Sequence, residues 1–219
     1  EMQIMKIFKK SKDIQSHGEL VSKIFEQNIK NFSKIPKIIE VGSGITTDFL
    51  NKLSLKYKCE VISIDNNSSK VKFLNENIKE ISPKLSFIVG DSLEILKNIV
   101  RNSKIDLLFL DSAPSAIHTF KEFLICENAF ESGSCLIIDN AKIPEEKSNR
   151  NPARKGKIIV PYLLASKSWE VFSHPYSGDM MIVAIKRSEK QYADIKYELD
   201  DYTDNWKNQL ESYFHYRSK

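Results

Sequence analysis

The sequence lacks the features that mark membrane proteins and multidomain chains. No apolar run approaches the ~18 residues that a membrane-spanning helix needs. No stretch rich in proline, glycine or serine divides the 219 residues. We therefore expect one domain over residues 1–187, followed by a C-terminal helical extension over residues 188–219. Residues 1–12 are basic but have no continuous apolar stretch, so we expect no signal peptide.

Cysteine and net charge are also scarce. The three cysteines, Cys59, Cys126 and Cys135, form no CxxC pair. An odd count without a disulfide framework favours a reducing, cytoplasmic environment, and we expect all three thiols to be buried packing groups. The net charge of +4 comes without a strongly basic face. This argues against a nucleic-acid partner.

What the sequence does contain is a regular alternation of short apolar runs and amphipathic segments. The first five runs are continuously apolar, which is typical of strands covered on both faces of a parallel sheet. In chain order, the expected strands are Lys37–Gly42, Cys59–Asp65, Leu85–Asp91, Ile105–Asp111, Ser134–Asn140, Trp169–Pro175 and Met180–Arg187. The amphipathic segments predict a covering helix within residues 13–33 and helices at Asp48–Tyr57, Ser69–Ile81, Leu93–Val100 and Ala116–Phe130.

The last two expected strands break this alternation. Only the short segment 176–179 joins them, so they must be antiparallel, because a parallel return needs a dozen or more residues. We predict an α/β fold with a doubly wound, Rossmann-like sheet of seven mostly parallel strands. The expected strand order is 3-2-1-4-5-7-6, with strand 7 antiparallel.

In such sheets the ligand binds beyond the carboxyl ends of the strands. The first expected strand ends in a glycine turn that contains Gly42, Ser43 and Gly44. The glycines permit a tight turn and a close approach of a ligand to the backbone. Thr46 or Thr47 is expected to cap the next helix. Because position 47 is not glycine, the dinucleotide fingerprint is incomplete, which argues against an NAD enzyme.

Acidic residues end the next two strands. Asp65 lies 21 residues after Gly44, close to the ~20 residues expected for an acid that binds a ribose. A helix cap is the alternative for Asp65. The third strand ends in Gly90-Asp91-Ser92, where Asp91 suits either the edge of an adenine or the N-cap of the following helix.

Together with Leu110-Asp111, these motifs resemble those of class I S-adenosylmethionine-dependent methyltransferases, over roughly residues 35–187. The resemblance implies that Gly42 and Gly44 pack against the methionine part of the cofactor, Asp65 holds the ribose and Asp91 lies at the adenine. The full set that it implies for S-adenosylmethionine is Glu40, Gly42, Ser43, Gly44, Thr46, Thr47, Asp65, Asn66, Gly90, Asp91, Ser92 and Asp111.

The fourth and fifth expected strands end in Asp111 and in the pair Asp139-Asn140. Two carboxylates and an amide oxygen form a hard set of ligands suited to Mg²⁺ or another divalent cation. This subset is similar to the cation-dependent O-methyltransferases of the catechol and caffeoyl-CoA type. Those enzymes have a catalytic lysine three residues after the first Asp, where this chain has Pro114. A metal site and metal-free positioning of the substrate therefore both stay open.

Without that lysine, another residue must take the acceptor's proton. His118 is the first candidate for the catalytic base, acting beside Asp111, and His174 is the second. The basic segment 141–157 is interpreted either as a lid over the acceptor or as a solvated loop. The aromatic C-terminal extension is interpreted either as a homodimer contact or as a cover for the acceptor pocket.

The predicted function is O-methylation of a small molecule from S-adenosylmethionine. One alternative is a nucleic-acid or protein methyltransferase. The segment Asp111–Pro114 lacks the Asn/Asp-Pro-Pro-aromatic sequence often found in the amino-directed nucleic-acid enzymes. The other alternative is a protein of the same fold that binds the cofactor without catalysis.

Overall fold

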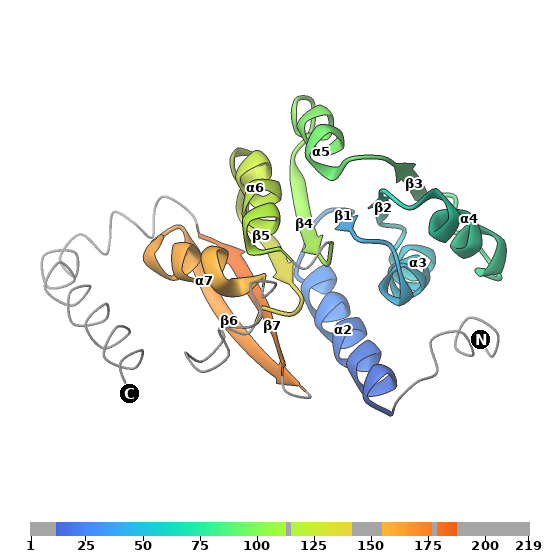
Figure 1. Ribbon diagram of the computed structural model, residues 1–219, viewed down its shortest axis with the longest axis horizontal. Coiled ribbons are helices and arrows are strands. Elements are labelled where there is room, and N and C mark those ends of the chain that lie inside the picture. The colour runs from blue at the N-terminus through green and yellow to red at the C-terminus, as the bar shows by residue number, and fades with distance from the viewer. Residues whose placement is uncertain (1–11, 113–114, 142–154, 177–178, 188–219) are drawn as a thin grey trace, which may run out of the picture.

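The strands form one seven-stranded sheet in the order β3-β2-β1-β4-β5-β7-β6 (Figure 1). The computed structural model describes residues 12–112, 115–141, 155–176 and 179–187. The strands are β1 (Lys37–Val41), β2 (Glu60–Asp65), β3 (Leu85–Val89), β4 (Ile105–Leu110), β5 (Phe130–Ile138), β6 (Trp169–Tyr176) and β7 (Asp179–Lys186). Strands β1 to β5 are parallel, and β7 runs antiparallel to both β5 and β6. The predicted topology is confirmed.

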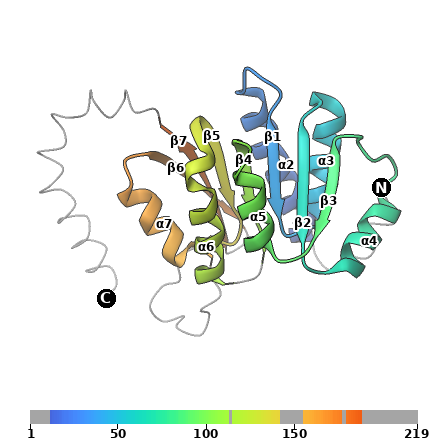
Figure 2. The ribbon, with the colours of Figure 1, turned by 90° about the horizontal axis from the view of Figure 1, so that it is seen from above.

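Helices cover both faces of the sheet (Figure 2). One face carries α2 (Lys12–Lys30), α3 (Ile45–Tyr57) and α4 (Ser68–Asn77), and the other carries α5 (Ser92–Val100), α6 (Ala116–Cys126) and α7 (Gly156–Ala165). A short 3-10 helix, η1 (Glu127–Ala129), follows α6. Adjacent strand residues such as Leu107 and Leu108 enter opposite cores. This explains why the strand sequences are continuously apolar.

Three predicted helix ends are wrong. Helix α6 ends at Cys126, because η1 follows and Phe130 already begins β5. Side-chain hydrogen bonds explain the other two. Helix α3 begins at Ile45 with Gly44 as its N-cap. Thr47 caps it from the first turn, where its hydroxyl accepts the Gly44 amide in a capping box, and Thr46 donates to Glu40 instead. Helix α4 ends at Asn77 instead of Ile81. The side chain of Asn51 holds the loop after α4, donating to the Glu80 carbonyl and accepting from the Ser82 amide.

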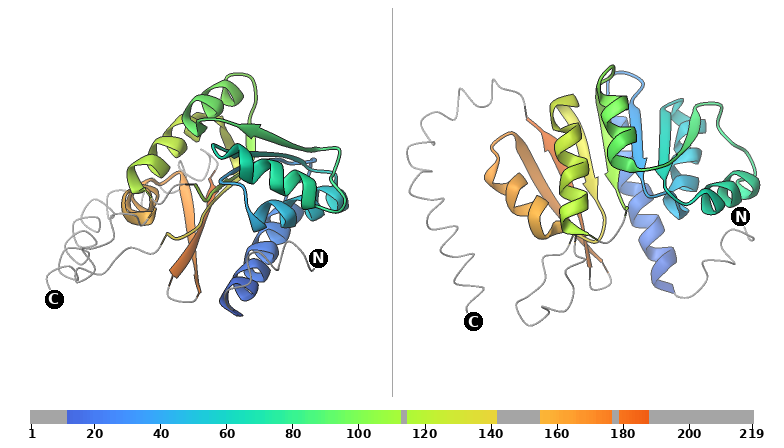
Figure 3. Two further views of the ribbon diagram at one scale, coloured as in Figure 1. Left: turned by 45° about the vertical axis from the view of Figure 1, so that its right-hand side comes forward. Right: turned by 45° about the horizontal axis from the view of Figure 1, so that its top comes forward.

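The region from β5 to β6 differs most from the prediction. Strand β5 begins four residues early, at Phe130, because it includes the polar residues 131–134 and a register shift opposite β4. Helix α7 was not predicted, since it contains Pro161 and β-branched residues that disfavour a helix. Figure 3 shows α7 beside α6, where Tyr162 contacts Phe120 and Phe123. Tertiary packing therefore overrides weak local preference.

The three cysteines are buried and free, as expected. Burial raises the pKa of the Cys126 thiol to about 12 and raises that of Cys135 as well. Both thiols therefore stay protonated and pack as small apolar groups. Within the described ranges, no helix is long and apolar enough to cross a membrane.

Candidate functional site

The glycine turn after β1 touches the end of β4. Gly42 has a positive φ of 99° and donates its amide to the Ile64 carbonyl at 2.8 Å. A Cβ atom at Gly42 would lie 2.2 Å from the backbone oxygen of Asp111. At Gly44, by contrast, a Cβ atom would meet no atom within 4 Å. The turn is therefore closed against Asp111 at Gly42 and open at Gly44.

Glu40, in β1, holds this turn in place through hydrogen bonds. It is fully buried, and its carboxylate accepts hydrogen bonds from Thr46 at 2.6 Å, Thr47 at 2.6 Å and Ser63 at 2.5 Å. Thr47 Oγ1 in turn accepts the Gly44 amide at 2.8 Å. The hydroxyls of Thr46 and Thr47 are thus used inside the protein, where they join β1 to the first turn of α3.

Burial also changes the acidity of Glu40. Desolvation raises its pKa to about 7, with a further upward effect from the charge of Asp111, against the lowering effect of the three hydroxyl groups. The folded protein therefore holds a proton on Glu40 at a pH where the unfolded chain has lost it.

We expect this proton to make the free energy of unfolding depend on pH. Because the folded pKa lies above the ordinary value of 4.5, the contribution is complete below that value. As the pH rises from 4.5 to about 7, this stabilising contribution of the Glu40 proton is lost. The free energy of unfolding then falls by about 3 kcal/mol, at ~1.4 kcal/mol per pH unit. In Glu40→Gln this dependence should disappear, since glutamine does not titrate. Urea unfolding of both proteins at about pH 5 and about pH 8 measures the difference. Parallel pH profiles would contradict the assignment.

The acid at the end of β2 lies next to the turn. Asp65 Oδ2 accepts the Ser43 amide at 2.9 Å, and Oδ1 accepts the Asn67 amide at 2.8 Å. Lys70 forms an ion pair with the same carboxylate. The N-cap of α4 is Asn67, so Asp65 does not cap that helix, and the neighbouring Asn66 is exposed.

The residues at the end of β3 face a buried network between α5 and α6. Asp91 is the N-cap of α5 and accepts the amides of Leu93 and Glu94. Ser92 donates to the buried carboxylate of Glu122 at 2.6 Å. His118 Nε2 lies 3.0 Å from Glu122 Oε1 and 3.1 Å from Ser92 Oγ.

Ser112, which directly follows Asp111, donates to the other oxygen of Glu122 at 2.8 Å. Glu122 therefore ties the loop after β4 to the start of α5 through one carboxylate. Gly90, which directly follows β3, also lies at the carboxyl edge of the sheet and has a positive φ of 155°.

A lysine that the sequence places in the loop after β5 reaches the end of β4. Lys155 Nζ lies 2.5 Å from Asp111 Oδ1 and 3.5 Å from Asn140 Oδ1, and its side chain is only 2% exposed. Asn140 Nδ2 also contacts Asp179 Oδ2 at 3.3 Å, and Asn140 has a positive φ of 51°. Asp139 is buried beside it. The structure thus brings Asp111 and Asn140 together around an ammonium group.

Sequence reasoning counted Lys155 among the basic residues of a loop and missed this contact. The signal that could have found it is Gly156, which lets the chain approach the end of β5 closely. Pro114, residues 142–154 of the expected lid and the C-terminal extension lie outside the described residues. His174 lies in β6 and pairs in register with Met181 of β7.

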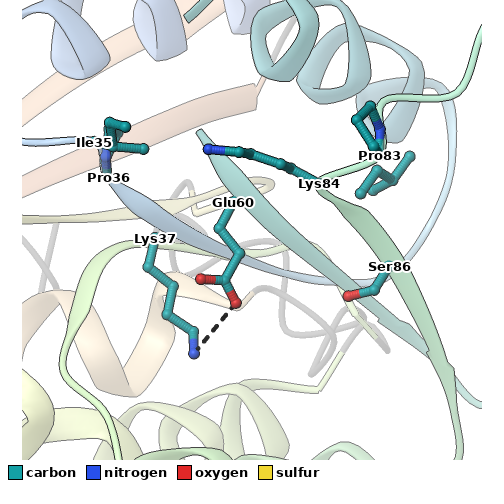
Figure 4. A pocket seen from close by; sticks show the side chains of 8 residues that line it. Ile35, Pro36, Lys37, Glu60, Pro83, Lys84 and Ser86 are labelled. Atoms are coloured by element: carbon teal, nitrogen blue, oxygen red, sulfur yellow. Dashed lines mark ion pairs between the residues drawn. The ribbon is translucent and has the colours of Figure 1, made fainter. Parts of the chain in front are cut away.

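A hollow at the opposite edge of the sheet does not belong to this site. Its lining comes from the amino ends of β1, β2 and β3 and the segments before them, and Lys37 and Glu60 form an ion pair of 3.5 Å there (Figure 4). The residues predicted from the strand ends lie at the carboxyl edge, where α/β sheets bind ligands.

The chain is similar to known proteins in sequence and in fold. A family model described as a methyltransferase domain matches residues 33–212. No curated protein matches the chain. An O-methyltransferase from Bacillus cereus, solved with S-adenosylhomocysteine, shares 16% identity, with a TM-score of 0.66 over 78% of this chain and 81% of that one.

Two further solved structures share the fold. The O-methyltransferase TomG from Streptomyces achromogenes, solved with S-adenosylmethionine, is 16% identical, with a TM-score of 0.66 over 85% of this chain and 87% of that one. The methyltransferase MycE from mycinamycin biosynthesis, solved with Mg and S-adenosylhomocysteine, is 12% identical, with a TM-score of 0.56 over 75% of this chain and 49% of that one. At these identities the likeness shows a shared fold.

Proposed function

Because the chain belongs to the methyltransferase domain family, we propose that it transfers the methyl group of S-adenosylmethionine to an oxygen atom of a small molecule. The observation that carries the proposal is the open backbone at Gly44, flanked by the Asp65 carboxylate and by Asp111 across Gly42. All three lie at the carboxyl ends of neighbouring strands. The solved O-methyltransferases with the same fold support oxygen as the acceptor atom.

The residues present fit this cofactor. The space at Gly44 leaves the backbone accessible, as a close ligand requires. The Asp65 carboxylate already accepts two backbone amides and pairs with Lys70, and a carboxylate has about four acceptor positions, so it can still accept a ribose hydroxyl group. Asp91 and Ser92 would border the adenine. Glu40, Thr46 and Thr47 would act indirectly, by fixing the shape of the turn.

When bound, S-adenosylmethionine supplies an electrophilic methyl group on a sulfonium. The acceptor oxygen gives an electron pair to the new C–O bond, the C–S pair returns to sulfur, and the hydroxyl proton leaves. Asp111, next to both the turn and Lys155, would orient the acceptor, since alignment dominates such a displacement. His118 is the proposed proton acceptor, and the Glu122 carboxylate at 3.0 Å would balance its charge.

A divalent cation fits the site poorly. The sequence offers Asp111, Asp139 and Asn140 as oxygen ligands, but the Lys155 ammonium already contacts Asp111 and Asn140. A second cation on the same oxygens would be repelled. We derive no step that depends on a metal.

Loss of the Asp65 carboxylate is expected to weaken cofactor binding. Asp65→Ala removes a charged hydrogen-bond acceptor, which corresponds to a roughly 10- to 100-fold weaker affinity for S-adenosylhomocysteine in isothermal titration. Asp106→Ala is the matched control, because Asp106 also accepts a backbone amide, that of Lys37 at 2.8 Å, and pairs with a lysine, but at the amino edge of β4. Equal affinity in both variants would refute the ribose assignment.

A transfer assay with radiolabelled methyl groups over a panel of phenols, sugar hydroxyls and carboxylic acids tests the reaction itself. We expect transfer to at least one oxygen acceptor, and lower transfer in Asp111→Asn. Binding of S-adenosylhomocysteine without transfer to any oxygen, amine, protein or nucleic-acid acceptor would contradict the proposed activity. Such a result would favour a protein that binds the cofactor without catalysis.

A further inference from the structure

The buried ammonium of Lys155 is the least expected group at the acceptor end of the site. Its side chain is 2% exposed, and its Nζ lies within hydrogen-bond distance of Asp111. Removing an ammonium from water costs several kcal/mol unless a partner compensates. Lys155 is therefore buried here because of the oxygens that it contacts. The inference below rests on the proposed function, since it concerns the acceptor end of the same site.

The backbone next to Lys155 is fixed independently of that ion pair. Helix α7 begins at Gly156, and a Cβ atom at Gly156 would lie 1.8 Å from the backbone oxygen of Ala141. Ala141 follows Asn140 and donates its amide to the Met180 carbonyl at 2.8 Å. Only glycine permits this contact, which places residue 155 beside the end of β5.

The Lys155 Nζ atom lies where a metal ion would have to lie to bind both Asp111 and Asn140. Mg²⁺ binds carboxylate and amide oxygens at about 2.0–2.1 Å, so a metal shared by Asp111 and Asn140 would lie between the two oxygens that Nζ contacts. An ammonium supplies one positive charge there without recruiting an ion from solution. It also donates up to three hydrogen bonds.

We propose that Lys155 takes the place of a divalent cation between Asp111 and Asn140, so that methyl transfer by this protein needs no metal. The lysine is a positioning residue. Its charge holds Asp111 and Asn140 in place and offers a donor to an acceptor oxygen. Asp111 and Asn140 still supply oxygen atoms of the kind that bind a metal, and the Lys155 ammonium lies between them.

Binding of Mn²⁺, followed by electron paramagnetic resonance, tests this assignment without any methyl transfer. We expect the wild-type protein to bind no Mn²⁺ with a Kd below about 1 mM. Lys155→Ala should gain a site at least ~10-fold tighter, because no ammonium then repels the ion at Asp111 and Asn140. The double variant Lys155→Ala with Asp111→Asn should lose that site again. Lys70→Ala is the matched control. It also removes a lysine from an aspartate, Asp65 at the end of β2, and should gain no Mn²⁺ site.

Two results would overturn the assignment. One is Mn²⁺ binding to the wild-type protein that Asp111→Asn abolishes. The other is a Lys155→Ala variant that stays folded, as judged by circular dichroism, and gains no Mn²⁺ site.

Activity supplies a second readout. Once an acceptor is known, wild-type transfer should change less than about twofold on addition of EDTA, and Mn²⁺ should raise the activity of Lys155→Ala more than that of the wild type. Loss of wild-type activity in EDTA would contradict the proposal. If the Mn²⁺ results hold but no acceptor is methylated, the proposed function fails while the cation assignment stands.

Discussion

Gly42→Ala should lose about 4 kcal/mol of unfolding free energy, enough to leave much of the protein unfolded. The positive φ of 99° costs a residue with a Cβ atom about 2 kcal/mol. The 2.2 Å approach to the Asp111 oxygen adds about 2 kcal/mol more, because two strand ends must move apart. Urea unfolding followed by circular dichroism measures the loss.

Gly44→Ala is the matched control for that loss. Its φ of −178° is extended backbone, and a Cβ atom there meets nothing within 4 Å. We expect a change in the free energy of unfolding below about 1 kcal/mol. The added methyl group should instead lower the affinity for S-adenosylhomocysteine, because it enters the space proposed for the cofactor. Equal stability of the two variants would show that the close contact at Gly42 is not maintained.

Asp111→Ala should destabilise the fold by about 3 kcal/mol, because it leaves the Lys155 ammonium buried without its carboxylate. Lys155→Met removes the charge at similar volume and should cost less than about 1 kcal/mol. The double variant should then be about as stable as Lys155→Met alone. The expected coupling energy in the double-mutant cycle is therefore about 3 kcal/mol, equal to the cost of Asp111→Ala alone.

The pair Asp48–Lys52 is the control for this cycle. The same two residue types lie 2.9 Å apart on α3, four residues apart, and the lysine is 50% exposed where Lys155 is 2% exposed. Its coupling energy should not exceed about 0.5 kcal/mol. Additive effects at Asp111 and Lys155, no larger than those of the surface pair, would contradict a tight buried contact.

The sheet could be predicted because its pattern is local. Continuous apolar runs identify strands covered on both faces, and the short connection before Met180 requires an antiparallel pair. The strand ends then follow, and with them the positions of Gly42, Asp65 and Asp111. These residues come together because parallel strands end at one edge.

What the sequence could not show depends on contacts between distant residues. Lys155 reaches Asp111 across 44 residues, and no spacing rule connects them. Pro161 conceals α7, whose packing against α6 outweighs its weak helix preference. Thr47 caps α3 as its hydroxyl suggested, but the sequence could not show that the Thr46 and Thr47 hydroxyls both donate to the buried Glu40 carboxylate.

The contact between Gly156 and Ala141 has a consequence for how the family can diversify. It holds residues 141 and 156 together, so the two ends of the connection between them are fixed by the body of the protein. Lengthening a connection whose ends are already joined costs only about 0.6 kcal/mol for each doubling. That stretch can therefore be exchanged or extended as a cassette while the sheet stays unchanged.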